Sequence, residues 1–147
     1  RDRAATVLRN KVDEILTENE NAKIIIMGDF NDYPVDKSLY QILRARKDRK
    51  FDNGDLYNTA YALEKQDLGT YNYKGDWGML DQLIISKGFF KADTGVTITS
   101  KDCQIHKLDW MLYTDPKYGD QKPSKTYGGP EYYGGYSDHL PIYIELN

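Results

Sequence analysis

The chain has 147 residues, 39% of them hydrophobic and 29% charged, which is typical of one globular domain and excludes an intrinsically disordered chain. Its formal net charge of -3 argues against a protein that grips nucleic acid through many phosphates. No apolar run reaches the roughly 20 residues of a membrane-spanning helix. The single cysteine, Cys103, excludes an internal disulfide.

The first third of the chain predicts a helix, a strand and a second helix. Residues 1–19 place their apolar side chains on one helical face, with charged side chains opposite. The apolar run at 24–27 is typical of a strand that is buried on both faces. Residues 38–46 predict a second helix, with Asp36 or Ser38 as its N-cap.

The middle of the chain predicts a β-hairpin. Residues 57–65 are ambiguous and are compatible with a short helix. Residues 69–73 alternate like a strand, residues 74–78 supply a turn, and residues 79–86 predict the second strand of the hairpin.

The last third predicts further strands around one long loop. Residues 94–100 and 141–146 are expected as strands, and residues 103–105 extend the sheet. Residues 115–135 are rich in Gly, Pro and Tyr and predict a long surface excursion, a kind of segment that is often functional. The expected fold class is α/β, with one mainly antiparallel sheet, helices on one face, and a single domain over residues 1–147.

Tyrosine is unusually frequent, with thirteen copies in the chain. Several gather late: Tyr127, Tyr132, Tyr133, Tyr136 and Tyr143. One interpretation is the preference of aromatic residues for half-buried strands. The other is a stacking surface for bases or sugars.

Two polar side chains, Asp29 and Asn31, directly follow the predicted strand at 24–27. Residues two apart in extended backbone point to the same side, and layered α/β sheets bind ligands at the carboxyl ends of strands. The same residues also suit a simple Asx turn. A third polar residue, Asp81, lies inside an apolar strand, where a carboxylate needs a partner unless it faces solvent.

Asp138 and His139 lie side by side before the last predicted strand. A carboxylate is a ligand suited to Mg²⁺ or Mn²⁺, and an imidazole exchanges a proton near neutral pH. Taken alone, His139 is better explained as a loop histidine.

Three motifs occur in order: IIIMGDFND at 24–32, WGMLDQLIIS at 77–86 and GYSDHLPIYIEL at 135–146. Together they resemble the C-terminal half of the endonuclease/exonuclease/phosphatase family, which includes DNase I-like and apurinic-endonuclease-like hydrolases. The likeness extends over essentially the whole chain. Each motif is short, but three in this order are specific, and the late segment is most similar to bacterial members.

The resemblance implies a role for each of the polar residues. Asp29 would position or deprotonate the attacking water, and Asn31 would hold the scissile phosphate. Asp81 would hydrogen-bond His139, which would contact the phosphate and support the transition state. Asp138 would contact the metal, together with Asp29. Whether His139 or Asp29 is the base stays open, because mechanisms within the family differ.

The resemblance also implies a two-layer α/β sandwich longer than this chain, whose N-terminal half supplies an Asn and a Glu for the Mg²⁺ or Mn²⁺ ion. The chain begins at Arg1 without an initiator methionine or signal peptide, so we expect an inactive piece of a longer enzyme. Its open sheet face should be covered by the missing half or by a second chain. The alternative is a non-catalytic half-domain that binds a sugar or nucleotide through its tyrosines.

The expected enzyme is therefore a Mg²⁺-dependent phosphodiesterase or phosphatase. Its substrate could be a nucleic acid, a lipid head group or a small phosphoester, and the acidic net charge argues mildly against tight DNA binding. Localisation stays open between the cytoplasm and export.

Overall fold

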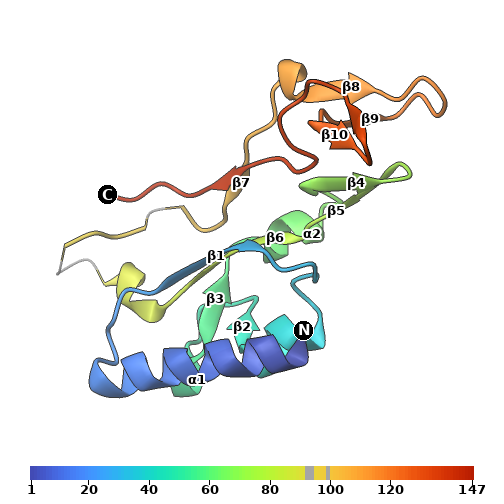
Figure 1. The fold of residues 1–147 in the computed structure, drawn as a ribbon. Coiled ribbons are helices and arrows are strands. Elements are labelled where there is room, and N and C mark those ends of the chain that lie inside the picture. Colours follow the sequence, from blue (N-terminus) through green and yellow to red (C-terminus); the bar gives the residue numbers. More distant parts are fainter. Residues whose placement is uncertain (92–94, 99) are drawn as a thin grey trace.

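A computed structural model describes residues 1–91, 95–98 and 100–147 (Figure 1). The helices are α1 (Asp2–Glu18) and α2 (Tyr61–Glu64), and the shorter 3-10 or π turns are η1 (Ser38–Ile42), η2 (Asp52–Gly54), η3 (Lys87–Phe90) and η4 (Asp109–Met111). The strands are β1 (Ile25–Asp29), β2 (Ala45–Arg46), β3 (Leu56–Asn58), β4 (Tyr71–Tyr73), β5 (Asp76–Gly78), β6 (Asp81–Ile85), β7 (Gln104–Ile105), β8 (Leu112–Thr114), β9 (Gln121–Pro123), β10 (Tyr127–Gly128), β11 (Glu131–Tyr132) and β12 (Ile142–Tyr143). Helices with short strands in small sheets fit the predicted α/β class.

Helix α1 confirms the helix predicted at 1–19. Its apolar stripe packs on the sheet, where Val12 is buried. Arg9 is buried as well, and its guanidinium donates to the carbonyl oxygens of Leu43 at 3.2 Å and Gly54 at 3.0 Å. These bonds tie α1 to the loops beside the sheet, because a buried guanidinium must find acceptors. No helix in the described ranges is long and apolar enough to cross a bilayer.

The main sheet has the strand order β1-β6-β3-β2. Strand β6 pairs antiparallel with both β1 and β3, while β2 and β3 are parallel. Side chains alternate across β6, so Ile84 joins one core cluster while Leu83 and Ile85 join another. The first cluster, against α1, contains Val12, Leu39, Leu43, Ala45, Leu56 and Ile84. The second contains Tyr57, Ala60, Met79, Leu83, Ile85, Phe89, Ile98 and Cys103.

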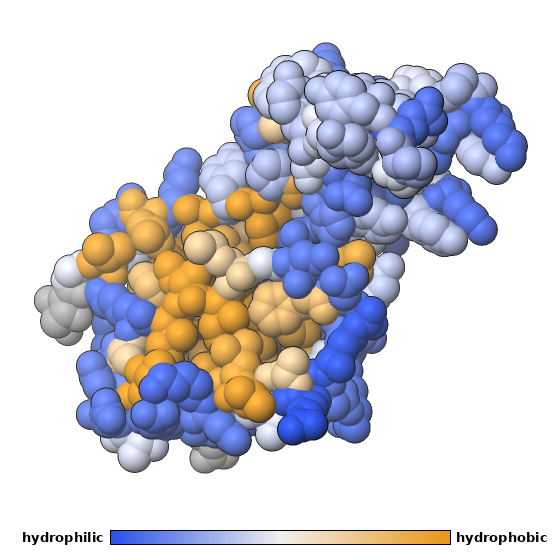
Figure 2. All heavy atoms as spheres, in the orientation of Figure 1, coloured by the Kyte–Doolittle hydropathy of each residue, from blue (hydrophilic) through white to orange (hydrophobic). Residues whose placement is uncertain are grey.

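Strand β1 is less buried than its sequence predicts. It lies at the edge of the sheet and, among the described residues, pairs only with β6. Ile26 packs against the α1 cluster, but Ile25 is exposed and Met27 is 74% exposed. The expectation of burial on both faces was wrong. An apolar run shows that the side chains of a strand are suited to burial, but it does not show that other segments cover both faces. Figure 2 shows the resulting apolar surface, which extends from the region of β1 toward α1.

The first strand of the predicted hairpin pairs with a different segment than expected. Strand β4 pairs with β5, which was expected to be a turn, and the tight reversal lies at Lys74 and Gly75, both with positive φ. The second predicted strand contains β6, which joins the main sheet instead of pairing with β4. Trp77 pairs with Asn72 across the hairpin, so this aromatic residue continues the strand although Gly and Asp flank it.

The predicted helix at 38–46 is shorter than expected. Only the π turn η1 forms, and β2 replaces its last residues because they pair with β3. Lys37 occupies the N-cap position, and no side chain caps it, so both expected caps were wrong. Instead, Asp36 Oδ2 accepts the Tyr33 backbone N–H at 2.8 Å, and the Ser38 hydroxyl donates to buried Asp32.

The last third contains more structure than a long loop. Two hairpins, β8–β9 and β10–β11, form a lobe beside β4 (Figure 1). Strand β12 pairs with β7 in a separate two-stranded sheet, so the expectation that residues 103–105 extend the main sheet was wrong. The strand predicted at 94–100 includes residues 94 and 99, which lie outside the described residues. Ile98 makes an isolated antiparallel bridge to Leu146.

Candidate active site

Asp29 and Asp81 lie directly opposite each other where β1 ends and β6 begins. Opposed residues in an antiparallel pair share one face of the sheet, with Cβ atoms roughly 4.5–5.5 Å apart. The turn after β1 is fixed to β6 because the Phe30 backbone N–H donates to the carbonyl oxygen of Leu80 at 3.0 Å. Like charges in this position destabilise a sheet, so each carboxylate needs its own donors.

Asn31 supplies the donors for Asp29. Its backbone N–H donates to Asp29 Oδ1 at 2.8 Å, and its side-chain amide donates to Oδ2 at 3.0 Å. Asn31 has a φ of 51°, in the left-handed region that Asn tolerates better than most residues. The Asx turn considered from the sequence therefore forms, and it also orients both polar side chains at the exposed end of β1.

His139 supplies the partner for Asp81. Its Nδ1 lies 2.7 Å from Asp81 Oδ2, which also accepts a hydrogen bond from the Thr70 hydroxyl. An ionised carboxylate can only accept, so Nδ1 carries the proton, and in the neutral ring Nε2 is then the acceptor nitrogen. Within residues 1–91, 95–98 and 100–147, no hydrogen bond to Nε2 is present. Asp81 is thus not a solvent-facing strand residue, and His139 is more than a loop histidine.

Thr70 and Tyr71 position His139 although sequence reasoning missed both. The rings of Tyr71 and His139 stack with centroids 4.8 Å apart and planes tilted by 31°. Their backbones form an isolated antiparallel bridge, and the Leu140 N–H donates to the carbonyl oxygen of Thr70 at 2.8 Å. Residues 69–73, with the sequence GTYNY, suggested only a strand. Its role depends on pairing with a segment nearly seventy residues later, which no local pattern reveals.

Asp138 is exposed beside this pair, in a turn where the Ser137 hydroxyl accepts the His139 backbone N–H at 3.0 Å. The donors for a divalent cation are incomplete. Among the described residues, no three His, Cys, Asp or Glu side chains are grouped to hold a metal ion. Both oxygens of Asp29 already accept hydrogen bonds from Asn31. Asp29 and Asp138 are suitable oxygen donors, but they do not form a whole site.

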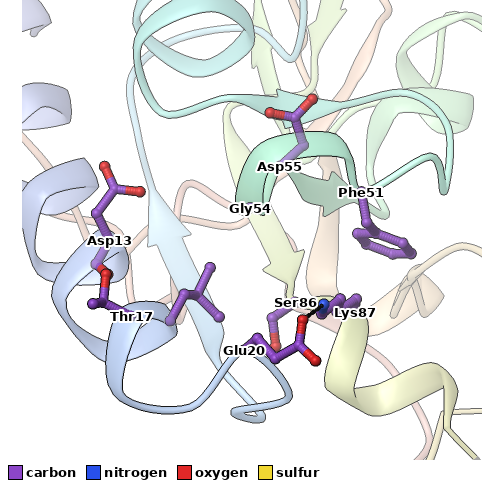
Figure 3. Close-up of a pocket in the computed structure, with 9 residues that line it drawn as sticks. Asp13, Thr17, Glu20, Phe51, Gly54, Asp55, Ser86 and Lys87 are labelled. Atoms are coloured by element: carbon purple, nitrogen blue, oxygen red, sulfur yellow. Dashed lines mark hydrogen bonds and ion pairs between the residues drawn. The ribbon is translucent and has the colours of Figure 1, made fainter.

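Another cavity, of about 340 Å³, lies at the opposite end of β6, between α1 and the loop that carries Phe51 and Asp55 (Figure 3). Its three carboxylates are all paired. Asp13 accepts from Arg9, Asp55 accepts from Arg44 and Arg46, and Glu20 lies 2.8 Å from Lys87. The hydrogen bond from Lys87 lowers the pKa of Glu20, and the one from Arg9 lowers that of Asp13. These ion pairs stabilise the fold, and none of the three carboxylates is free to act as a base or a metal ligand.

The lone cysteine is not a candidate nucleophile. Cys103 is buried in the core cluster with Leu83 and Ile85. Burial raises the pKa of its thiol to about 11, so the reactive thiolate is scarce at neutral pH. Asp29, Asp81 and His139 therefore stay the candidate groups of the site.

Comparison with known families agrees with this geometry. A family model described as the endonuclease/exonuclease/phosphatase family matches residues 1–147. Searches of curated proteins and of solved structures gave no significant match. Because the match covers the whole chain, the chain belongs to the endonuclease/exonuclease/phosphatase family. Membership points to hydrolysis of phosphoesters, as in nucleases and phosphatases, and members generally use divalent metals.

Proposed function

We propose that this chain carries the water-activating part of a divalent-cation-dependent phosphoester hydrolase. The observation that carries the proposal is the 2.7 Å contact between Asp81 and His139, directly across the strand pair from Asp29. A carboxylate, an amide and an oriented imidazole thus gather at one end of the sheet. These are groups that can orient a water molecule and meet charge on a phosphate.

Each residue has a distinct proposed role. His139 is held at Nδ1, so Nε2 is directed to the phosphate or to the proton in transfer. Asp29 orients the attacking water, and Asn31 donates to a phosphate oxygen when its amide leaves Asp29. Two bases remain candidates: Asp29, which is exposed, and His139 through Nε2. The base takes a proton from the attacking water, whose oxygen bonds to phosphorus as the P–O bond to the leaving group breaks, and the leaving oxygen takes up that proton or one from solvent.

The proposal includes a divalent cation that this chain would bind together with ligands from outside the described residues. The cation would offset negative charge on the phosphate oxygens. Asp138 and Asp29 would contribute ligands, and the remaining ligands would come from outside the described residues, which group too few for a whole site. We therefore expect residues 1–147 alone to hydrolyse little.

Among the described residues, one edge of β1 has no strand partner, and Met27 on β1 is exposed; both observations support a further part of the proposal. A strand with one unpaired edge and an apolar face is a template for another strand. We propose that the chain is the C-terminal half of a two-layer α/β sandwich. Its missing half, or a second chain, would pair with β1 and cover the surface in Figure 2.

The test uses the protein that contains this chain, with a phosphodiester substrate and Mg²⁺ or Mn²⁺. His139→Ala and Asp29→Asn are each expected to abolish turnover, and EDTA is expected to do the same. The matched controls are His106→Ala, which removes the other histidine, and Asp76→Asn, which removes an exposed strand carboxylate. Full activity in either site variant would refute the assignment.

A second candidate function is a binding half-domain without catalysis. The observation that favours it is the exposure of the late tyrosines, among them Tyr127 and Tyr132, whose ring centroids lie 5.2 Å apart. This reading predicts no turnover, and sugar or nucleotide affinity that is lost when these tyrosines are replaced. Turnover that depends on His139 would exclude it.

A further inference from the structure

A small apolar pocket adjoins His139 on the side of the late lobe. Its volume is about 110 Å³, and its lining includes Trp110, Tyr136, Leu140 and Pro141 together with His139. Trp110 and Tyr136 form an edge-to-face pair, with ring centroids 5.1 Å apart and planes at 80°. The pair is exposed, at 56% for Trp110 and 72% for Tyr136. Large aromatic side chains that are exposed beside a reactive group are available to bind a ligand, because they are not buried in the core.

The pocket is held in place by backbone bonds, which makes it a fixed feature of the site. The carbonyl oxygen of Ser124, the residue directly after β9, accepts hydrogen bonds from the backbone N–H groups of Tyr136 at 2.6 Å and Ser137 at 3.2 Å. The Ser124 N–H donates to the carbonyl oxygen of Met111 at 2.7 Å. The segment that carries Trp110 and the segment that leads into His139 are therefore joined through one residue. A preorganised surface loses less entropy when it binds a ligand.

Size and lining point to one kind of occupant. The pocket is well below the roughly 300–1,000 Å³ of a site for a drug-sized ligand, so it accommodates a single ring and not a dinucleotide. The side chains of Trp110, Leu140 and Pro141 offer apolar contact, and none of the lining residues is Lys or Arg. The polar lining residues include Ser124, Ser137 and His139, and the phosphate would lie at His139.

We propose that Trp110 and Tyr136 form a subsite for the ring of the group esterified to the phosphate, so that the substrate is a small phosphoester with a ring that presents a flat apolar face. The inference rests on the proposed function, because the phosphate is assumed to lie at His139. An aromatic ring and the apolar face of a sugar share this chemistry, and stacking on aromatic side chains serves both.

The experiment measures binding of phosphonates, which a phosphoester hydrolase cannot cleave, to the protein that contains this chain. Calorimetry compares phenylphosphonate, cyclohexylphosphonate and methylphosphonate. We expect a ring compound to bind about tenfold more tightly than methylphosphonate, as one stacking contact provides. A preference for phenyl alone assigns an aromatic ring. A similar gain for cyclohexyl assigns the apolar face of a saturated ring, as in a sugar.

Variants locate the effect. Trp110→Leu and Tyr136→Ser are each expected to reduce toward one the ratio of the affinity for a ring phosphonate to the affinity for methylphosphonate. Tyr118→Ser, which removes an equally exposed tyrosine from the β8–β9 hairpin, is expected to leave it unchanged. Equal affinity of all three phosphonates for the native protein would overturn the proposal. So would a ring preference that survives both pocket variants. Because binding is measured without turnover, an absence of hydrolysis can be told apart from an absence of ring binding.

Discussion

At the scale of single residues, Asp81 is the group on which the orientation of His139 depends. It accepts from Nδ1 of His139 and from the Thr70 hydroxyl. In Asp81→Asn the neutral amide no longer fixes the tautomer, so we expect kcat to fall about 10- to 100-fold, as when the carboxylate behind a functional histidine is removed elsewhere. Thr70→Val should reduce kcat less, because it removes only the support of Asp81. Steady-state kinetics on both variants checks this, and an unchanged kcat in Asp81→Asn would contradict the proposed pairing.

Cys103 gives a prediction about stability and pH. Its thiol has a pKa of about 11 in the folded chain, above its ordinary value of 9.0, because burial disfavours the thiolate. The unfolded chain therefore releases this proton first, and the contribution of the thiol to stability is present below pH 9 and lost between pH 9 and 11. Cys103→Ala should show a smaller alkaline loss of the free energy of unfolding. Urea titrations at pH 8 and pH 10.5 measure the difference, and equal losses in both proteins would contradict the burial argument.

At the scale of elements, the strongly periodic segments were predictable and the pairing was not. Helix α1 and strand β6 follow from apolar spacing, because each presents a face that must be buried. The site residues Asp29, Asp81 and His139 stood out through three ordered motifs. Tyr71 could not be found because its contact to His139 is distant in sequence, and the bond from Thr70 to Asp81 follows from no local pattern. The pairing of β4 with β5 was missed because Gly75 and Gly78 look like parts of one turn.

The late lobe depends on a close approach at Gly135. A Cβ at this position would overlap the backbone of Ser124, which joins the lobe to the segment before His139. We expect Gly135→Ala to move the lobe away from His139 and to lower kcat/KM for a ring-bearing phosphodiester by about tenfold, close to the effect of a lost stacking contact. Gly119→Ala is the control, because this glycine has a φ of 75° and open space, so its strain stays in a distant turn. Equal losses in the two variants would show that the contact with Ser124 is immaterial.

At the scale of the whole molecule, the uncovered apolar surface is the most conspicuous feature (Figure 2). Ile25 and Met27 on β1 are exposed next to a strand edge without a partner among the described residues, and Val7 is exposed on α1. Residues 1–147 prepared alone should therefore self-associate, and Met27→Lys should shift them toward the monomer by charging the edge strand. Light scattering measures the mass. A native fragment that stays monomeric at high concentration would contradict the proposal that this surface is normally covered.

The central claim is that water attacks phosphorus at a site that includes Asp29 and His139. The most direct measurement is turnover of a phosphodiester in H₂¹⁸O by the protein that contains this chain, followed by ³¹P NMR and mass spectrometry of the products. The account predicts one ¹⁸O atom in the phosphate product, none in the released alcohol, and no turnover in His139→Ala. Label in the alcohol, or undiminished turnover in His139→Ala, would contradict it.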